Sequence, residues 1–194
     1  MRMLIVIRIV HTPFDMGSVR EDLVKEGVAR MGRQRWEENQ RRIEQFWNEV
    51  ETEVDLLGLD SKGLHIYQDG LPCAGALGER IVRETAAKGS RNYQIVQKLM
   101  DQGARIEATE SPTLLRQEYD YIKAFMEAKS DVERREAEAS YNSVKDKLLE
   151  ERDAFIAGSI DTTLGDGETG LLFIGASHDV IPRLPKDIEV KLLD

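Results

Sequence analysis

The sequence is poor in cysteine, in long apolar runs and in positive charge. Its one cysteine, Cys73, cannot form a disulfide within the chain; this suits a reducing compartment, and we expect a cytoplasmic protein. No apolar run approaches the roughly 18 residues needed to span a bilayer, so no membrane association is expected. The formal net charge of -9 argues against a nucleic-acid partner, because binding phosphates requires an excess of Lys and Arg.

The sequence does contain enough apolar residues for one core. With 194 residues, 41% of them hydrophobic, we expect a single domain spanning 1–194. The N-terminal apolar run is interrupted by Arg8 and lacks a small-residue cleavage site, which favours a buried first strand over a signal peptide. Short apolar segments bounded by turn residues predict five strands, at about 4–10, 64–68, 104–108, 171–174 and 188–192.

The segments between these strands have helical periodicity. They predict two helices in 18–58 broken near Gly32, two in 76–101 divided at Gly89 and Ser90, and two in 111–160 separated near Ser130 and Asp131. Strands that alternate with helices predict right-handed crossovers and parallel pairing. We therefore predict an α/β fold with a small, mostly parallel sheet of four to five strands covered by many helices, including helical insertions at about 18–58 and 111–160.

Residues able to bind a metal or move a proton follow the predicted strands. In an open α/β sheet, ligands bind beyond the carboxyl ends of the strands, where loops and helix N-termini converge. The residues expected there are His11, Gln68, Asp69, Glu107, Glu110, His178 and Asp179, which include two of the three histidines. Two imidazoles with carboxylates form the ligand set of a divalent transition metal such as Mn, Co, Zn or Fe. The sequence therefore predicts a metal site, for which hydrolysis is the natural chemistry.

Simpler interpretations apply to the same residues. A histidine after a strand can cap a loop or bond a backbone carbonyl, which would account for His11 or His178 taken alone. His65, inside the second strand, is interpreted as a structural or surface histidine. The charged stretch 127–153 is interpreted as a solvated helix face with neighbouring opposite charges.

Three parts of the chain resemble the TraB, GumN and Tiki superfamily. "ERDAFIAGSI" at 151–160, followed by "GLLFIGASHDV", is similar to the closing signature of that family, in which a Glu-Arg-Asp or Arg-Asn element on a helix precedes a strand ending in Gly-x-x-His, here 175–178. "RIVHTPFD" resembles the opening signature around His11, with Arg8 in the place of the first Gly. "IEATESPTLLRQEY" is similar to the middle segment and places Glu110 ahead of a helix.

This resemblance implies a metal-centred hydrolytic site more strongly than it implies a substrate. The implied metal ligands are His11, Glu110 and His178. Glu107 or Asp69 is then a base or a further ligand, and Asp69 stands where the family has a longer Glu. Arg152 is implied to clamp a substrate carboxylate or an oxyanion, the alternative being an ion pair within its own helix. The resemblance also leaves open a homodimer in which a second subunit covers the substrate.

Three functions are compatible with the sequence. The first is a metal-dependent hydrolase that acts on a peptide or amide bond in a small-molecule or peptide substrate. The second is a non-catalytic protein of the same fold that binds a small molecule or haem, or that regulates another protein. The third is an interaction protein whose long charged helices mediate assembly. The first function predicts that replacing His11 or His178 removes metal binding, whereas the third predicts no effect on assembly.

Overall fold

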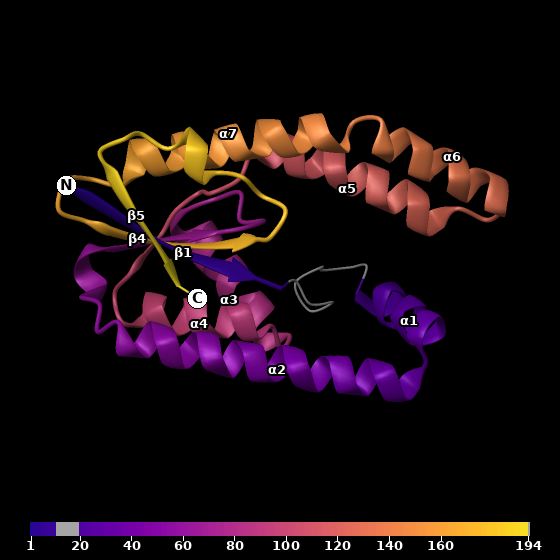
Figure 1. Ribbon diagram of the computed structural model, residues 1–194, viewed down its shortest axis with the longest axis horizontal. Helices are drawn as coiled ribbons and strands as arrows, with labels where there is room; N and C mark the ends of the chain where they lie inside the picture. The colour runs from indigo at the N-terminus through magenta and orange to yellow at the C-terminus, as the bar shows by residue number, and fades with distance from the viewer. Residues whose placement is uncertain (11–19, 194) are drawn as a thin grey trace.

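The computed structural model describes residues 1–10 and 20–193, which include a five-stranded sheet (Figure 1). The strands are β1 (Arg2–Ile9), β2 (Leu64–Gln68), β3 (Arg105–Ile106), β4 (Thr169–Gly175) and β5 (Ile188–Leu193). All neighbouring strands run parallel, in the order β3-β2-β4-β1-β5. The predicted α/β class with a small parallel sheet is therefore confirmed.

The register of the sheet brings the ends of three strands to one edge. Ile9, the last residue of β1, pairs with Gly175, the last residue of β4. Gln68, the last residue of β2, pairs with Phe173, and the backbone N–H of Asp69 then donates to the carbonyl of Phe173 over 2.9 Å. Residues that follow these strands therefore emerge near one another at the carboxyl edge of the sheet.

Seven helices lie in the part of the chain that the structure describes. They are α1 (Arg20–Met31), α2 (Arg33–Leu56), α3 (Gly75–Ala87), α4 (Arg91–Asp101), α5 (Pro112–Glu127), α6 (Asp131–Asn142) and α7 (Lys145–Thr163), with short 3-10 turns at Ser61–Gly63 and Ile181–Arg183. Between α1 and α2, Gly32 has a φ of 82°, a left-handed conformation that glycine adopts at little cost. The predicted helix breaks near Gly32 and at Gly89 and Ser90 are confirmed.

The region 111–160 contains one helix more than the sequence pattern predicted. Ser111 and Pro112 begin α5, with the Ser side chain accepting a backbone hydrogen bond, as this pair of residues predicts. Ser130 caps α6 in the same way. A further break at 143–144 separates α6 from α7. No glycine or proline marks that break, which is why the helical pattern appeared to continue through it.

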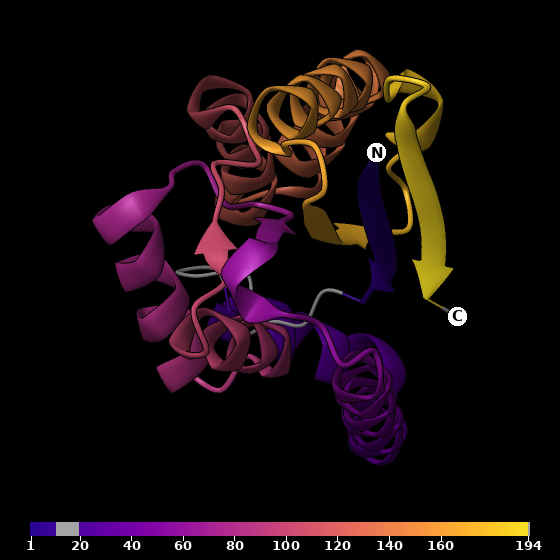
Figure 2. The same cartoon turned by 90° about the vertical axis from the view of Figure 1, so that its left-hand side faces the viewer.

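Helices cover both faces of the sheet, and successive residues of a strand alternate between the two. On one face, Ile5 and Ile7 of β1 pack with Phe173 of β4 and with α2, α3 and α4. On the other face, Leu4 and Val6 of β1 pack with α7. Figure 2 shows α7 on one side of the sheet and α2 and α4 on the other. The nearly continuous apolar sequence of β1 is explained by burial on both faces.

Two helical arms extend past the carboxyl edge of the sheet (Figure 1). The hairpin of α5 and α6 forms one arm, and α1 with the first half of α2 forms the other. Arg134 of α6 makes an ion pair with Glu26 of α1, so the two arms are linked. Among the described residues, no helix is both long enough and apolar enough to cross a membrane.

Candidate metal centre

Three residues that are distant in sequence meet at the carboxyl edge of the sheet. Asp69 follows β2 directly, Glu110 lies between β3 and α5, and His178 lies shortly after β4. One ligand atom from each lies within 4.8 Å of the other two. Their exposed fractions are 5%, 0% and 6%, so the cluster is buried. We call Asp69, Glu110 and His178 the triad; a single metal ion could contact all three.

Backbone hydrogen bonds position the members of the triad. The N–H of Glu110 donates to the carbonyl of Leu71 over 3.1 Å and ties its loop to the turn after β2. The N–H of His178 donates to the carbonyl of Gly175 over 3.2 Å, which closes the turn after β4. The N–H of Gly175 in turn donates to Oδ2 of Asp69 over 3.0 Å. The small-residue turn after β4 therefore places the imidazole beside the carboxylate of Asp69.

A carboxylate on the far side of the His178 ring fixes the orientation of that ring. Nδ1 lies 2.5 Å from Oδ1 of Asp153, whose Oδ2 accepts from the N–H of Asp179 over 2.9 Å. When Asp153 is a carboxylate, which only accepts hydrogen bonds, Nδ1 is the donor. Nε2 then lies 3.5 Å from Oδ2 of Asp69. Histidines that bind metals commonly have this arrangement, in which one ring nitrogen bonds a carboxylate and the other contacts the ion.

Arg152 of α7 is held by three carboxylates of the site. Its Nε and Nη2 lie 3.2 and 2.5 Å from the two oxygens of Glu110, Nη2 lies 3.0 Å from Oδ1 of Asp69, and Nη1 lies 2.5 Å from Oε2 of Glu118. Arg152 therefore reaches the strand edge and does not form an ion pair within α7 in these contacts, while its predicted role as a clamp on substrate stays a prediction. Burial lowers the pKa of Arg152, but the hydrogen bond and charge of Glu110, with the charges of Asp69 and Glu118, outweigh it and raise that pKa.

Among the described residues, the cluster contains more acidic than basic side chains. Four carboxylates, those of Asp69, Glu110, Glu118 and Asp153, surround one guanidinium and one imidazole. If all four acids were ionised and the imidazole protonated, the described residues of the cluster would carry two negative charges in excess. Burial raises the pKa of Glu110, although the hydrogen bond and charge of Arg152 oppose the rise. Buried excess charge of this kind is relieved either by protons or by a bound cation.

Glu107, predicted as a base or further ligand, contacts a different histidine. Its Oε1 lies 2.9 Å from Nδ1 of His65, and Nε2 of His65 lies 3.0 Å from Oε2 of Glu168. The contact to Glu168 meets the distance of a hydrogen bond but not its angle. We call His65, Glu107 and Glu168 the His65 group. The structure thus joins Glu107 to this group and not to the triad.

His11, predicted as a metal ligand, lies outside the described residues, which stop at Val10 before it. Of the six predicted site residues, the structure brings together four, which are Asp69, Glu110, Arg152 and His178. The fifth, Glu107, lies in the His65 group. The contribution of His11 stays a prediction.

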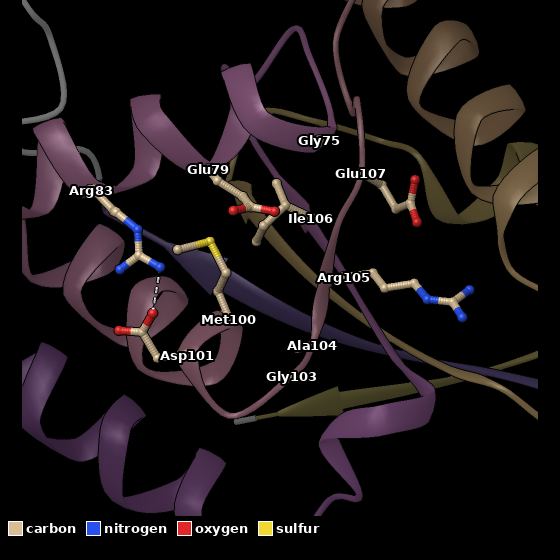
Figure 3. Close-up of a pocket in the computed structure, with 10 residues that line it drawn as sticks. All are labelled: Gly75, Glu79, Arg83, Met100, Asp101, Gly103, Ala104, Arg105, Ile106 and Glu107. Carbon is tan, nitrogen blue, oxygen red and sulfur yellow. Dashed lines mark ion pairs between the residues drawn. The ribbon is translucent and has the colours of Figure 1, made fainter.

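Two pockets of the structure do not include the triad. One of about 590 Å³ lies beside β3, between α3 and α4 (Figure 3). Arg83 and Asp101 form an ion pair at one end of it, and the side chains of Arg105 and Glu107 lie at the other. The second, of about 610 Å³, lies between α5 and α6. Because neither is lined by a triad residue, neither is a substrate cleft for this site.

Asp153 and Glu118 belong to the site but were not predicted as site residues. Asp153 follows Arg152 in α7, and both are buried on the helix face that also buries Ile156. Charged residues are almost never fully buried without a partner, so their place within an apolar helical pattern was a usable signal. Glu118 gave no such signal, because α5 buries none of its residues fully and the contact with Arg152 depends on how α5 packs against α7.

Comparison of the chain with protein-family models, with curated proteins and with solved structures found no match. The resemblance to the TraB, GumN and Tiki superfamily therefore rests on the sequence motifs alone. A fold by itself does not determine a function, whereas the geometry of the site limits the chemistry that the chain can perform.

Proposed function

We propose that the chain is a metal-dependent hydrolase in which the triad holds the ion and the substrate contains a peptide or amide bond. The proposal depends on one observation, the convergence of an imidazole and two carboxylates within 4.8 Å in a buried cluster. Mixed nitrogen and oxygen ligands favour Mn, Co, Zn or Fe, since Ca and Mg prefer oxygen alone. The motif resemblance supports a metal-centred hydrolytic site more strongly than it supports this class of substrate.

Each side chain of the cluster has a defined part in this proposal. His178 presents Nε2 to the ion while Asp153 holds Nδ1. Arg152 contacts both oxygens of Glu110 and one oxygen of Asp69, and so fixes the orientation of both carboxylates. Asp69, which also faces Nε2 of His178, completes the ligand set or accepts a proton as the base. A divalent ion in such a site supplies a water molecule whose pKa is lowered toward neutrality.

Metal binding is tested first by stability, with His65 as a matched control. His65 and His178 are both buried, at 2% and 6% exposure, and each lies next to carboxylates, but only His178 belongs to the triad. Binding to the native state raises the free energy of unfolding by about 2.7 kcal/mol when the free metal is at 100 times its Kd. We expect Mn, Co or Zn to stabilise the wild type and His65→Asn by this amount, and His178→Asn far less.

A structural role for the cluster is the second candidate, because Arg152 already contacts three of its carboxylates. This role predicts that purified protein contains no stoichiometric transition metal and that added metal does not change the unfolding temperature. That result would contradict the hydrolase proposal.

Catalysis is tested next by amine release from a peptide library with metal-loaded protein. If the wild type binds metal but releases no more amine than His178→Asn does, the non-catalytic alternative is favoured.

A further inference from the structure

β5 is the outer strand of the sheet on one side, and its outer edge is open among the described residues. It pairs with β1, whose other side pairs with β4. Figure 2 shows β5 at the outside of the sheet, with no described helix or strand beyond it. Leu192 near its end is 50% exposed. An outer strand of six residues presents unpaired backbone N–H and carbonyl groups that can pair with another strand.

The sequence of β5, Ile-Glu-Val-Lys-Leu-Leu, is complementary to itself in one antiparallel register. If Val190 pairs with Val190 of a second copy, Glu189 lies opposite Lys191 at two symmetric places. Ile188 then lies opposite Leu192, also twice, on the face of the sheet that carries Val190. Opposite charges and apolar pairs at directly facing positions stabilise antiparallel strands.

Neighbouring symmetric registers lack this complementarity. A two-fold axis perpendicular to a sheet keeps each face on the same side, so symmetric registers differ in steps of two residues. A shift one way places Glu189 against Glu189, and a shift the other way places Lys191 against Lys191. Like charges that face each other directly destabilise a strand pair. The charges therefore select the register centred on Val190.

We propose that the chain forms a symmetric dimer in which β5 pairs antiparallel with β5 of a second copy, centred on Val190. The two sheets join into one continuous sheet across the two-fold axis. Glu189 and Lys191 are exposed, and neither forms an ion pair with another described residue, so both are available to a partner. The triad lies after β2 and β4, on the other side of β1, so this inference does not depend on the proposed function.

The competing interpretation is that these charges keep the outer strand single. Natural proteins often place lysine and other charges on outer strands to prevent pairing. That interpretation predicts a monomer at every concentration. The dimer predicts instead a mass of twice 22.1 kDa in sedimentation equilibrium with the full chain at micromolar concentrations. A monomer at 100 times that concentration overturns the proposal.

Charge exchange tests the register. Glu189→Lys or Lys191→Glu alone places like charges opposite each other twice, and we expect the dimer Kd to rise about 10-fold or more. The double variant with both substitutions restores the opposite pairs and should return the Kd to near the wild-type value. Thermal unfolding of each variant checks that the subunit itself is intact. Equal Kd values in all four proteins, or no recovery in the double variant, overturn this register.

A cysteine cross-link provides the second test, in a Cys73→Ser background. Directly opposite residues have Cα atoms about 4.5 to 5.5 Å apart, within the range that a disulfide bridges. Val190→Cys should therefore form a disulfide-linked dimer under mild oxidation. Leu192→Cys is the matched control, because the two copies of position 192 are about 13 Å apart along the strands in this register. Position 192 is also the more exposed, so faster linking there would indicate random collision and overturn the proposal.

Discussion

Among the described residues two histidines are buried, His178 and His65; both lie between carboxylates, yet only His178 belongs to a described group that can hold a metal. Each ring nitrogen of His65 lies within 3.0 Å of a different carboxylate. Nε2 of His178 lies farther, 3.5 Å, from Asp69, and Glu110 completes a set of ligand atoms around it. Both ring nitrogens of His65 are in contact with carboxylates, whereas Nε2 of His178 lies at a longer distance from Asp69 that is compatible with an ion between the two.

The arginine beside His178 is buried, and the arginine that contacts the His65 group is exposed. Arg152 is 7% exposed and contacts both carboxylates of the triad. Arg105 lies 3.9 Å from Glu168 in the His65 group, and its side chain is 64% exposed. Water can screen the charge of the second arginine but not that of the first.

Residue types alone do not make a metal site. The carboxylates of the His65 group approach opposite nitrogens of one ring, so they do not face a common point. The carboxylates of the triad lie on the same side of His178, where their oxygens and Nε2 face one another. Convergence on one point is what distinguishes a ligand set from a pair of salt bridges.

The largest effect is expected when Arg152 is removed. In Arg152→Met the buried carboxylates of Glu110 and Asp69 lose their shared cation. Removing one partner of a buried ion pair costs about 3 to 5 kcal/mol, because the remaining charge is left uncompensated. We expect a loss of this size in the free energy of unfolding, measured by urea denaturation in the presence of chelator.

Arg105→Met is the control for that measurement. Because the Arg105 side chain is mostly exposed, its ion pair with Glu168 contributes about 1 kcal/mol or less. If Arg152→Met and Arg105→Met lose the same free energy of unfolding, the buried ion pairs of Arg152 contribute no more than the exposed ion pair of Arg105. A metal that restores the stability of Arg152→Met would show that an ion can take over the role of the guanidinium.

A change of pH should alter the free energy of unfolding in opposite directions through Glu110 of the triad and Glu168 of the His65 group. Burial raises the pKa of Glu110 above 4.5, so the native state binds the proton more tightly than the unfolded state and stability falls as the pH rises from about 4.5. The Gly165 N–H and His65 lower the pKa of Glu168, so its contribution is present above 4.5 and is lost as the pH falls through the lowered pKa.

This difference is measured by urea denaturation of metal-free protein between pH 3 and 7. Glu110→Gln should remove the fall in stability on the alkaline side of 4.5, and Glu168→Gln should flatten the loss on its acidic side. For one proton the change in slope is at most about 1.4 kcal/mol per pH unit. If both substitutions change the slope of unfolding free energy against pH in the same direction, the predicted difference between the triad and the His65 group is wrong.

The fold followed from local patterns to a large extent. The apolar run of β1 and the turn residues after β2 are short-range signals, and the predicted segments 4–10 and 64–68 correspond to strands in the structure. The break at 143–144 between α6 and α7 was missed because it depends on packing rather than on a glycine or proline.

The site was predictable only in part. The rule that strand ends share an edge placed Asp69 and His178 together, which the sheet register explains. The same rule placed Glu107 there as well, but β3 has only two residues and the Glu107 side chain turns to His65. The contact between Arg152 and the strand edge depends on the rotation of a helix, which strand patterns do not specify.

The smallest effect is expected for Glu107→Gln. The amide of Gln has both a donor and an acceptor and can keep the hydrogen bond to Nδ1 of His65 in either tautomer, so the loss of charge should change the free energy of unfolding by about 1 kcal/mol or less. Because Glu107 is not in the triad, stabilisation by Mn, Co or Zn should equal that of the wild type, whereas Glu110→Gln should reduce it. Stabilisation by metal is measured for each variant as the shift in its unfolding temperature over a metal titration. If Glu107→Gln weakens metal binding as much as Glu110→Gln does, the two histidine clusters act together, and the separation drawn between them fails.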